Sequence, residues 1–423
     1  MRTTLNLVLT LALALAICAC GKKKDEKKAD APAPAGMQAD DMAPDMAAAP
    51  DMAPTPPEKT GGGTLCAVPE GARVVKDTTF SKDCKLTLED GLEVDEGATL
   101  TLEPGVRLAF KVEKGLIVKN GKLVAKGTAE APVVLTSANP TPAAGDWNGV
   151  IFEEQHLLGQ VLEFVTVEYA GHDNHVAYKG GVIVAGSQGD GRLTITNCVI
   201  RNNAENGLVS LVDKAAFAKF EGNTFEKNGG NAMHLLAQTL GSVADANKYD
   251  EKITVSGRVS RSATFPKVAL PIYVDGNLDV GNDAAPPTLT LPEGTVLRFK
   301  GETGLFVAAD GAGALVAKKV TFTSHSPTPK SGDWYGVTLR DKTTGTTLEE
   351  CVIEFAGKDG PIGTGALVIE GDDVFPKGAT IKKLAIKGAA KAFGGPEAAC
   401  AELAKAELAN TLDDKPFTCP KEE

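Results

Sequence analysis

The chain has 423 residues, enough for several ordinary domains or for one long array of repeats. With 44 basic and 55 acidic residues the net charge is −11, which excludes the clustered basic surface that nucleic-acid binding requires. Hydrophobic residues make up 43% of the chain, so a large core can form, and 46 glycines and 24 prolines indicate many turns.

Residues 1–19 have the composition of an export signal. Arg2 provides a short positive region, and Leu5–Ile17 is apolar but too short to span a bilayer as a finished helix. The cleavage region Ile17-Cys18-Ala19-Cys20-Gly21 resembles that of bacterial lipoproteins. It predicts removal of residues 1–19 and acylation of Cys20.

Two alternatives to this anchor stay open. Acylation at Cys18 would place the bulky Ile17 next to the cleaved bond, and an ordinary secretory signal would leave no lipid. Gly21 follows the acylated cysteine, where inner-membrane retention uses Asp, so we expect attachment to the outer membrane through the lipid. The leaflet is not predicted.

Residues 20–63 are rich in Ala, Pro, Asp and Met, and Asp-Met-Ala recurs at 41–43, 45–47 and 51–53. Such a composition cannot build a packed core, which predicts a disordered tether between the lipid and a folded body.

The rest of the chain is duplicated. Three segments recur in the same order: Thr99–Phe110 as Thr288–Phe299, Gly145–Val150 as Gly332–Val337, and Leu162–Gly171 as Leu348–Gly357. Because the spacing between the copies is almost constant, the sequence predicts two tandem halves.

A shorter period lies inside each half. Ile195-x-x-Cys198-x-Ile200-x-x-Asn203 is followed about 25 residues later by Phe220-x-x-Asn223-x-Phe225-x-x-Asn228. The segments are short and alternating, so each coil must stack on the next to bury its apolar side. We expect Ile200, Phe225 and Ile386 to face a shared interior. The pairs Asn203/Asn228 and Asn206/Asn231 should form turn ladders, because Asn tolerates the left-handed conformation and bonds along the stack.

With these coils and the repeated Gly-Asp-Trp-x-Gly-Val turn, the chain resembles the right-handed parallel β-helix repeat proteins of the pectin-lyase-like superfamily. The resemblance implies an all-β solenoid. Its predicted parts are an N-terminal cap at 64–85, a first copy at 86–270, a second copy at 271–395 and a C-terminal cap at 396–423. In that cap Pro396 should open a helix with Cys400, Leu403, Ala404 and Leu408 on one face.

The cysteines divide into two groups. Cys66/Cys84 and Cys400/Cys419 are local pairs at the two ends, and in an exported protein they predict disulfides. Cys198 and Cys351 occupy inward positions many coils apart, so we expect buried free thiols. No zinc-binding Cys-x-x-Cys occurs.

Candidate ligand residues are few. Trp147, Glu168, Trp334 and Glu354 recur in both halves and could form a ligand surface. Repetition in both copies instead favours a packing role for the tryptophans and a solvated face or a structural role for the glutamates. His172, Asp173 and His175 are weak metal candidates, because a short polar turn rarely fixes three ligands. We therefore predict no metal and no cofactor.

The sequence favours a non-catalytic binding or scaffolding protein of the cell envelope, with polysaccharide, cell-wall material or an envelope protein as partner. The alternative is a polysaccharide lyase or glycoside hydrolase, because proteins of this resemblance cleave polysaccharides. Such enzymes need two flanking carboxylates, or a base with charge neutralisation of the substrate. No family catalytic residue can be transferred to a position here, so the sequence predicts no catalytic residues.

Overall fold

The structure is a computed structural model that describes residues 63–153, 159–172, 179–186, 192–211, 216–371 and 375–419. Residues 59–423 form one compact unit. Strands dominate the described residues, which include two α-helices, α1 (Ala237–Leu240) and α2 (Glu397–Leu403). Neither described helix is long and apolar enough to cross a bilayer.

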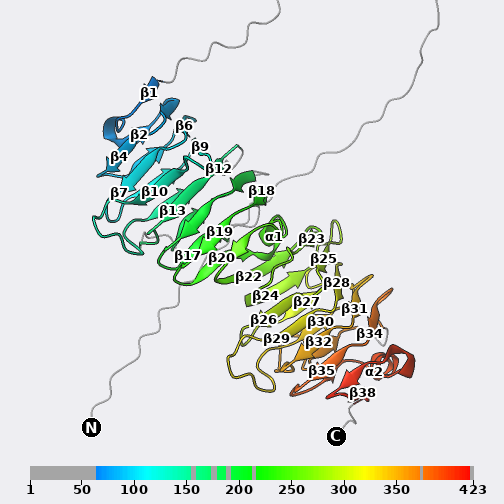
Figure 1. Ribbon diagram of the computed structural model, residues 1–423. Coiled ribbons are helices and arrows are strands. Elements are labelled where there is room, and N and C mark those ends of the chain that lie inside the picture. Colours follow the sequence, from blue (N-terminus) through cyan, green and yellow to red (C-terminus); the bar gives the residue numbers. More distant parts are fainter. Residues whose placement is uncertain are drawn as a thin grey trace, which may run out of the picture. The chain divides into compact units, whose positions relative to one another are not determined.

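The N-terminal copy is built from three parallel ladders, one strand of each per coil (Figure 1). The first ladder contains β1 (Gly63–Leu65), β3 (Thr78–Phe80), β6 (Thr99–Leu102), β9 (Lys122–Lys126), β12 (Val161–Glu163), β15 (Arg192–Thr196) and β18 (Ala216–Glu221). The second contains β4 (Lys85–Leu88), β7 (Arg107–Phe110), β10 (Val133–Ser137), β13 (Val165–Glu168), β16 (Val199–Arg201), β19 (Thr224–Glu226) and β21 (Lys248–Tyr249). The third contains β2 (Arg73–Val74), β5 (Leu92–Val94), β8 (Gly115–Val118), β11 (Gly149–Phe152), β14 (Gly180–Val184), β17 (Asn206–Ser210), β20 (Asn231–Leu236) and β22 (Lys252–Val259).

The C-terminal copy repeats this plan, and β24 (Ile272–Val280) starts two of its ladders. The first ladder contains β23 (Ala263–Thr264), β25 (Thr288–Leu291), β28 (Ala314–Lys318), β31 (Thr347–Glu349) and β34 (Thr380–Lys382). The second continues from β24 through β26 (Val296–Phe299), β29 (Thr321–Ser324), β32 (Val352–Glu354), β35 (Ala385–Lys387) and β37 (Thr411–Leu412). The third continues from β24 through β27 (Leu305–Val307), β30 (Val337–Leu339), β33 (Leu367–Ile369) and β36 (Phe393–Gly394).

The two copies are joined with a shift of one ladder. Ile253 in β22 pairs with Met233 of the N-terminal third ladder on one side and with Ile272 of β24 on the other. Ile272 then pairs with Leu297 in the C-terminal second ladder. Gly257, at φ 84°, allows β22 to bend so that its second part pairs with the second part of β24. The third ladder of the N-terminal copy therefore continues as the second ladder of the C-terminal copy.

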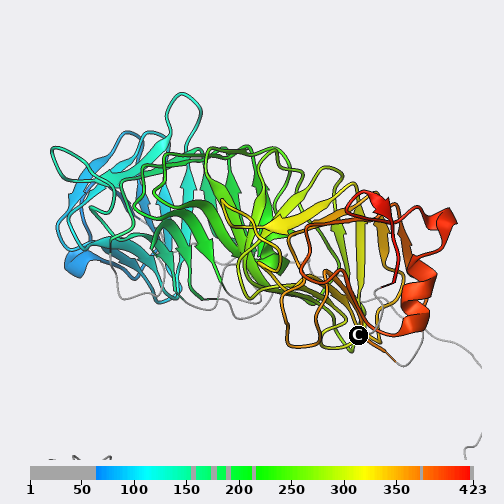
Figure 2. The ribbon, with the colours of Figure 1, turned by 90° about the horizontal axis from the view of Figure 1, so that it is seen from below.

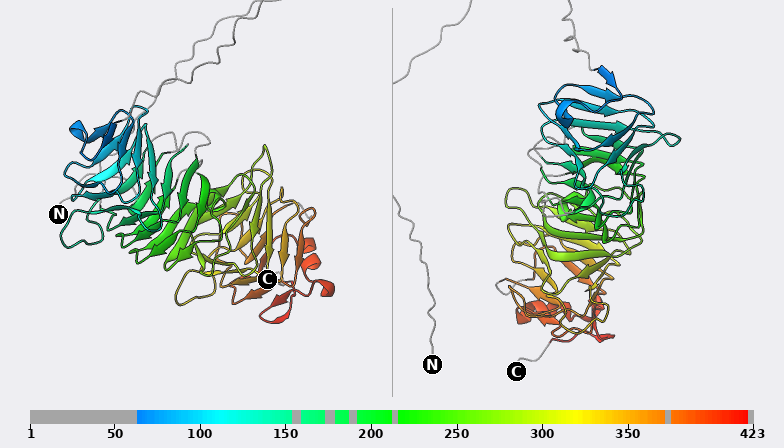
Figure 3. Two further views of the ribbon diagram at one scale, coloured as in Figure 1. Left: turned by 45° about the horizontal axis from the view of Figure 1, so that its top comes forward. Right: turned by 90° about the vertical axis from the view of Figure 1, so that its left-hand side faces the viewer.

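One apolar interior runs through both copies, as predicted. Ile200, Phe225 and Ile386 are buried in it, and the strands alternate buried and partly exposed residues. Figure 3 shows the coils following one another from the blue N-terminal strands to the red C-terminal ones. The parallel β-helix architecture is thus confirmed.

The predicted asparagine ladders are present, but their backbone conformation differs from the expectation. The Asn203 amide donates to Asn228 Oδ1 at 2.9 Å, and the Asn231 amide donates to Asn206 Oδ1 at 2.6 Å. The left-handed conformation lies one residue earlier, as at Asn202, where φ is 54°. The asparagines themselves are selected for hydrogen bonding along the stack.

The parallel ladders extend past residues 86 and 395. At the N-terminal end β1 already pairs with β3 after the short turn η1 (Glu70–Ala72), and at the other end β37 pairs with β35. A hairpin of β37 with the antiparallel β38 (Lys415–Pro416) closes the chain.

Helix α2 lies at the C-terminal end of the stack (Figure 2). Pro396 is its N-cap rather than its first helical residue, and Cys400 and Leu403 are buried. Leu408 was predicted on the same helical face, but α2 ends before it, and Leu408 lies half-buried in the separate turn η2 (Ala406–Leu408). The helix therefore covers the interior over fewer turns than the sequence suggested.

Both predicted disulfides are present. Cys66 bonds Cys84 across a separation of 18 residues, and Cys400 bonds Cys419 across 19. The second disulfide links helix α2 to the last described residue, and therefore joins two parts of the C-terminal cap.

Replacing Cys400 and Cys419 together by alanine should lower the free energy of unfolding of the C-terminal cap by about 3 kcal/mol, because a closed loop of this length restricts the unfolded chain. Hydrogen exchange of the α2 amides measures the change. Since coils contact only their neighbours, the double variant Cys66→Ala/Cys84→Ala should leave α2 protection unchanged. Equal α2 protection in both variants would contradict the expectation.

Candidate ligand surface

The two tryptophans are part of the interior, so the packing role favoured by their repetition fits the structure and the ligand-surface alternative does not. Trp147 precedes β11 and Trp334 precedes β30, and both side chains are fully buried. The Trp147 ring stacks on Phe110 at 4.5 Å, and the Trp334 ring stacks on Phe299 at 4.3 Å. Buried between coils, these rings cannot stack on a sugar.

Each indole also joins two turns of the chain. Trp147 Nε1 donates to the backbone oxygen of Glu168, and Trp334 Nε1 donates to that of Glu354, both at 2.8 Å. The repeated association of these tryptophans with these glutamates is therefore a backbone contact. It gives the tryptophans a structural reason to recur in both halves, whereas it does not select the glutamate side chains.

A closed loop precedes each tryptophan. In the N-terminal copy Asp146 accepts hydrogen bonds from Ser137 Oγ at 2.6 Å and from the backbone of Ala143 at 2.9 Å. In the C-terminal copy Asp333 accepts from Ser324 Oγ at 2.7 Å and from the backbone of Lys330 at 2.9 Å. These aspartates hold the loops through their Oδ2 atoms.

Glu168 faces outward on β13 but is engaged by its neighbours. Its carboxylate forms an ion pair with Arg201 at 2.9 Å and accepts a hydrogen bond from Thr136 at 3.1 Å, and only 13% of its side chain is exposed. Since Thr136, Glu168 and Arg201 lie on successive strands, the row forms a ladder of complementary groups. Glu168 is therefore not an open carboxylate.

Glu354 occupies the equivalent place on β32, and its strand neighbour is Lys387. Lys387 forms an ion pair with Asp414 at 2.9 Å. The two copies thus differ in the residues around the equivalent glutamate.

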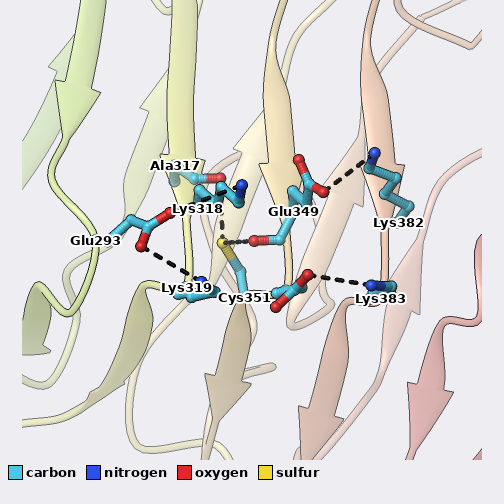
Figure 4. A network of polar contacts seen from close by, with 9 residues as sticks. Glu293, Ala317, Lys318, Lys319, Glu349, Cys351, Lys382 and Lys383 are labelled. Atoms are coloured by element: carbon cyan, nitrogen blue, oxygen red, sulfur yellow. Dashed lines mark hydrogen bonds and ion pairs between the residues drawn. The ribbon is translucent and has the colours of Figure 1, made fainter.

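The first ladder of the C-terminal copy carries two further rows of ion pairs (Figure 4). Glu349 pairs with Lys382 at 3.1 Å, and Glu350 pairs with Lys383 at the same distance. Glu293 forms ion pairs with both Lys318 and Lys319. These partly exposed pairs add little stability, but they neutralise the outward acids of this ladder.

The shift between the copies separates equivalent residues. Glu168 lies on a ladder that ends at β21, whereas Glu354 lies on the ladder that continues from β20 and β22. The candidate residues of the two halves therefore do not line up into one continuous ligand surface along a single ladder.

Several predicted residues cannot be placed. Cys20, Asp173 and His175 lie outside the described residues, as does the tether. His172 is described, and its backbone N–H donates to Trp147 O at 3.0 Å. Within the described ranges no group of three His, Cys, Asp or Glu side chains is arranged to hold a metal ion.

The free cysteines Cys198 and Cys351 are buried. The Cys198 thiol lies 3.4 Å from the carbonyl oxygen of Leu162, and the Cys351 thiol lies 3.4 Å from that of Ala317. Burial raises the pKa of Cys198 to about 12 and also raises the pKa of Cys351. A thiol held protonated in this way is a poor nucleophile.

We expect neither Cys198 nor Cys351 to react with iodoacetamide in the native protein at pH 8.5, because the thiolate that reacts is suppressed by the raised pKa and shielded by burial. Peptide mass mapping should show no adduct at Cys198 or Cys351 in buffer and one adduct at each of them in denaturant. Glutathione, a free thiol alkylated under the same conditions, is the control. Native labelling at the glutathione rate would show that the thiols are accessible.

A pocket of about 340 Å³ opens beside the loop that precedes Trp334. Its lining includes Lys300, His325 and Asp333. The sequence gives little indication of this pocket, because Lys300, His325 and Asp333 are far apart in the chain and form no recognisable motif. A difference between the two halves could have indicated the pocket, because His325 follows Ser324, whereas Ala138 follows the equivalent Ser137.

The described fold defines a parallel β-helix repeat protein. Within it, residues 72–161 match the family model described as a pectate-lyase-like β-helix domain. No curated protein and no solved structure matches the chain.

Proposed function

We propose that this protein is a lipid-anchored, non-catalytic β-helix of the cell envelope that binds a polymeric partner. Polysaccharide or cell-wall material is the preferred ligand, and an envelope protein is the next candidate. Parallel ladders support such a role because they present the same spacing, about 4.8 Å, from coil to coil.

The anchor is supported by the sequence around Cys20 and by the tether that follows it. Acylation of Cys20 would attach the protein to the outer membrane. Replacing Cys20 by alanine should abolish metabolic labelling with palmitate and move the protein from the membrane to the soluble fraction. Unchanged labelling and fractionation would reject the anchor at this residue.

The observation that carries the non-catalytic proposal is the pairing of outward carboxylates. Glu168 pairs with Arg201, Glu349 with Lys382 and Glu350 with Lys383. Hydrolysis of a glycosidic bond needs two carboxyl groups on either side of the bond, one of them protonated. Acids neutralised by basic residues on the next coil are suited to structure or binding.

The test is a glycan array together with a cell-wall pull-down, both using the full-length protein. Binding to a polymer in either experiment, without release of smaller products, supports the proposal. If both experiments give no binding, the proposed ligand class is rejected.

The alternative is a polysaccharide lyase or hydrolase, and the pocket in the C-terminal copy favours the lyase. His325 lines it and contacts Tyr273, while Arg298 lies on the neighbouring strand. Such groups could neutralise an acidic sugar and transfer a proton. Incubation with uronate polymers, with and without calcium, tests this: new ultraviolet absorbance from unsaturated products would establish the enzyme, and unchanged polymers would reject it.

A further inference from the structure

The pocket lies on the outward side of the C-terminal second ladder, near the junction of the two copies. Its lining includes Lys300, Ser324, His325, Ser326, Pro327 and Asp333. Tyr273, Arg298 and Thr323 are neighbours in strand register on the same ladder. Two residues further along the chain lie Asp275, still within β24, and Lys300 and His325, each one residue past the end of its strand. Lys300 and His325 line the pocket, while Tyr273 and Arg298 lie beside it on the same ladder.

Around His325 the positive charges of Lys252, Arg298 and Lys300 outnumber the carboxylates of Asp275 and Asp333. The Nε atom of Arg298 is buried and has no hydrogen-bond partner, and within the described ranges no carboxylate forms an ion pair with Arg298. Lys252 lies over the Tyr273 ring with its Nζ 5.5 Å from the centroid. The Tyr273 ring meets His325 edge-on at 4.8 Å. An unpaired buried guanidinium N–H is costly unless a ligand or water accepts its hydrogen bond.

The two nearby carboxylates, Asp333 and Asp275, interact with other residues of the protein. Asp333 accepts hydrogen bonds from Ser324 and Lys330, and Asp275 lies 3.3 Å from His234 Nε2. Burial, followed by the charges of Lys252, Arg298 and Lys300, lowers the pKa of His325, and Asp275 opposes this effect. His325 is therefore mainly neutral at pH 7 and can donate a hydrogen bond without adding charge.

The N-terminal copy has the same scaffold without these groups. By the repeat alignment, Ala109 and Ala138 stand where the C-terminal copy has Arg298 and His325. In strand register, Thr87 lies beside Ala109 as Tyr273 lies beside Arg298. The scaffold residues are shared, because Ser137, Asp146 and Lys111 correspond to Ser324, Asp333 and Lys300. Packing therefore does not require the arginine, the histidine or the tyrosine, so their presence in one copy needs another reason.

We propose that this pocket binds an oxyanion, a carboxylate or phosphate group, through Arg298, Lys300 and His325. The oxyanion would be carried by the polymer that the proposed function assigns to the protein. The inference rests on the proposed function for this polymer, but not for the binding of an oxyanion in the pocket. Arginine suits the role because its planar N–H groups form charge-assisted hydrogen bonds with such groups.

Isothermal titration of the full-length protein tests the site with three probes: inorganic phosphate, trigalacturonate and neutral maltotriose. Phosphate and trigalacturonate distinguish the two sources of the oxyanion. The decisive variant is Arg298→Ala, which introduces the residue that the N-terminal copy already tolerates at this place. The matched pair Lys300→Ala and Lys111→Ala separates a local effect from a general loss of positive charge.

We expect a charged probe to bind more tightly than maltotriose, and Arg298→Ala to weaken that binding about tenfold or more. Lys300→Ala should weaken it as well, and Lys111→Ala should leave it unchanged. Equal affinity of the wild type and Arg298→Ala, or no binding of either charged probe at millimolar concentration, would overturn the site. If a charged probe binds through Arg298 but no polymer binds in the array or the pull-down, the pocket stands and the proposed function fails. If a polymer binds without dependence on Arg298, the proposed function stands and the pocket fails.

Discussion

Replacing Trp334 by alanine is expected to lower the free energy of unfolding by about 4–5 kcal/mol. The indole is fully buried, stacks on Phe299 with an interplanar angle of 7° and donates to Glu354 O. Its removal leaves a cavity between two coils and a carbonyl without its partner. Equilibrium urea denaturation followed by far-ultraviolet circular dichroism measures the change.

Trp334→Phe is the matched control, because it keeps an aromatic ring against Phe299 but removes the N–H group. It should cost less than the alanine variant, about 1–3 kcal/mol. If Trp334→Ala instead unfolded at the wild-type urea concentration and lost polymer binding, the residue would belong to a ligand surface after all.

The interior could be predicted from the sequence because burial follows a short local period. Ile200 and Phe225 hold equivalent places in consecutive frames, and the structure pairs them directly in the second ladder. The asparagine ladders follow from the same spacing. In a solenoid, residues one period apart are neighbours in space, so sequence repetition translates directly into contacts.

The shift between the copies could not be predicted in the same way. The repeat alignment identifies Leu108 with Leu297, but it does not say which earlier strand each one continues. The connection is determined by β22 and β24, which bend near Gly257. The first part of β24 pairs with the second ladder of the C-terminal copy, and its second part pairs with the third ladder. A few residues at the junction therefore decide which surfaces of the two copies become continuous.

The candidate site was the least predictable part. The sequence shows that Trp147 and Trp334 recur, but recurrence does not distinguish a packed ring from an exposed one. The structure buries both rings, and it places Tyr273 and Arg298 side by side where the N-terminal copy has Thr87 and Ala109. In a duplicated chain, shared residues maintain the fold, whereas residues of only one copy indicate where function can differ.

Replacing Asn223 by alanine is expected to lower the free energy of unfolding by about 4 kcal/mol. Asn223 is fully buried; its Oδ1 accepts from Cys198 N at 2.9 Å, and its Nδ2 donates to Ile195 O at 2.9 Å and to Asn247 Oδ1 at 3.0 Å. The alanine variant leaves the backbone groups of Cys198 and Ile195 without these partners inside the stack, at about 1–3 kcal/mol for each group. Urea denaturation gives the total loss, and hydrogen exchange at Cys198 locates it.

Thr224→Ala is the matched control, since this neighbouring side chain is partly exposed on β19 and its loss should cost less than 1 kcal/mol. Asn410 makes equivalent bonds near the C-terminal end, to Leu384 N at 2.9 Å and Ile381 O at 3.3 Å. Because coils interact only with their neighbours, Asn410→Ala should leave exchange at Cys198 unchanged, while Asn223→Ala accelerates it. Equal stability of Asn223→Ala and Thr224→Ala would mean that water replaces the amide, and that the ladder contributes little to holding the coils together.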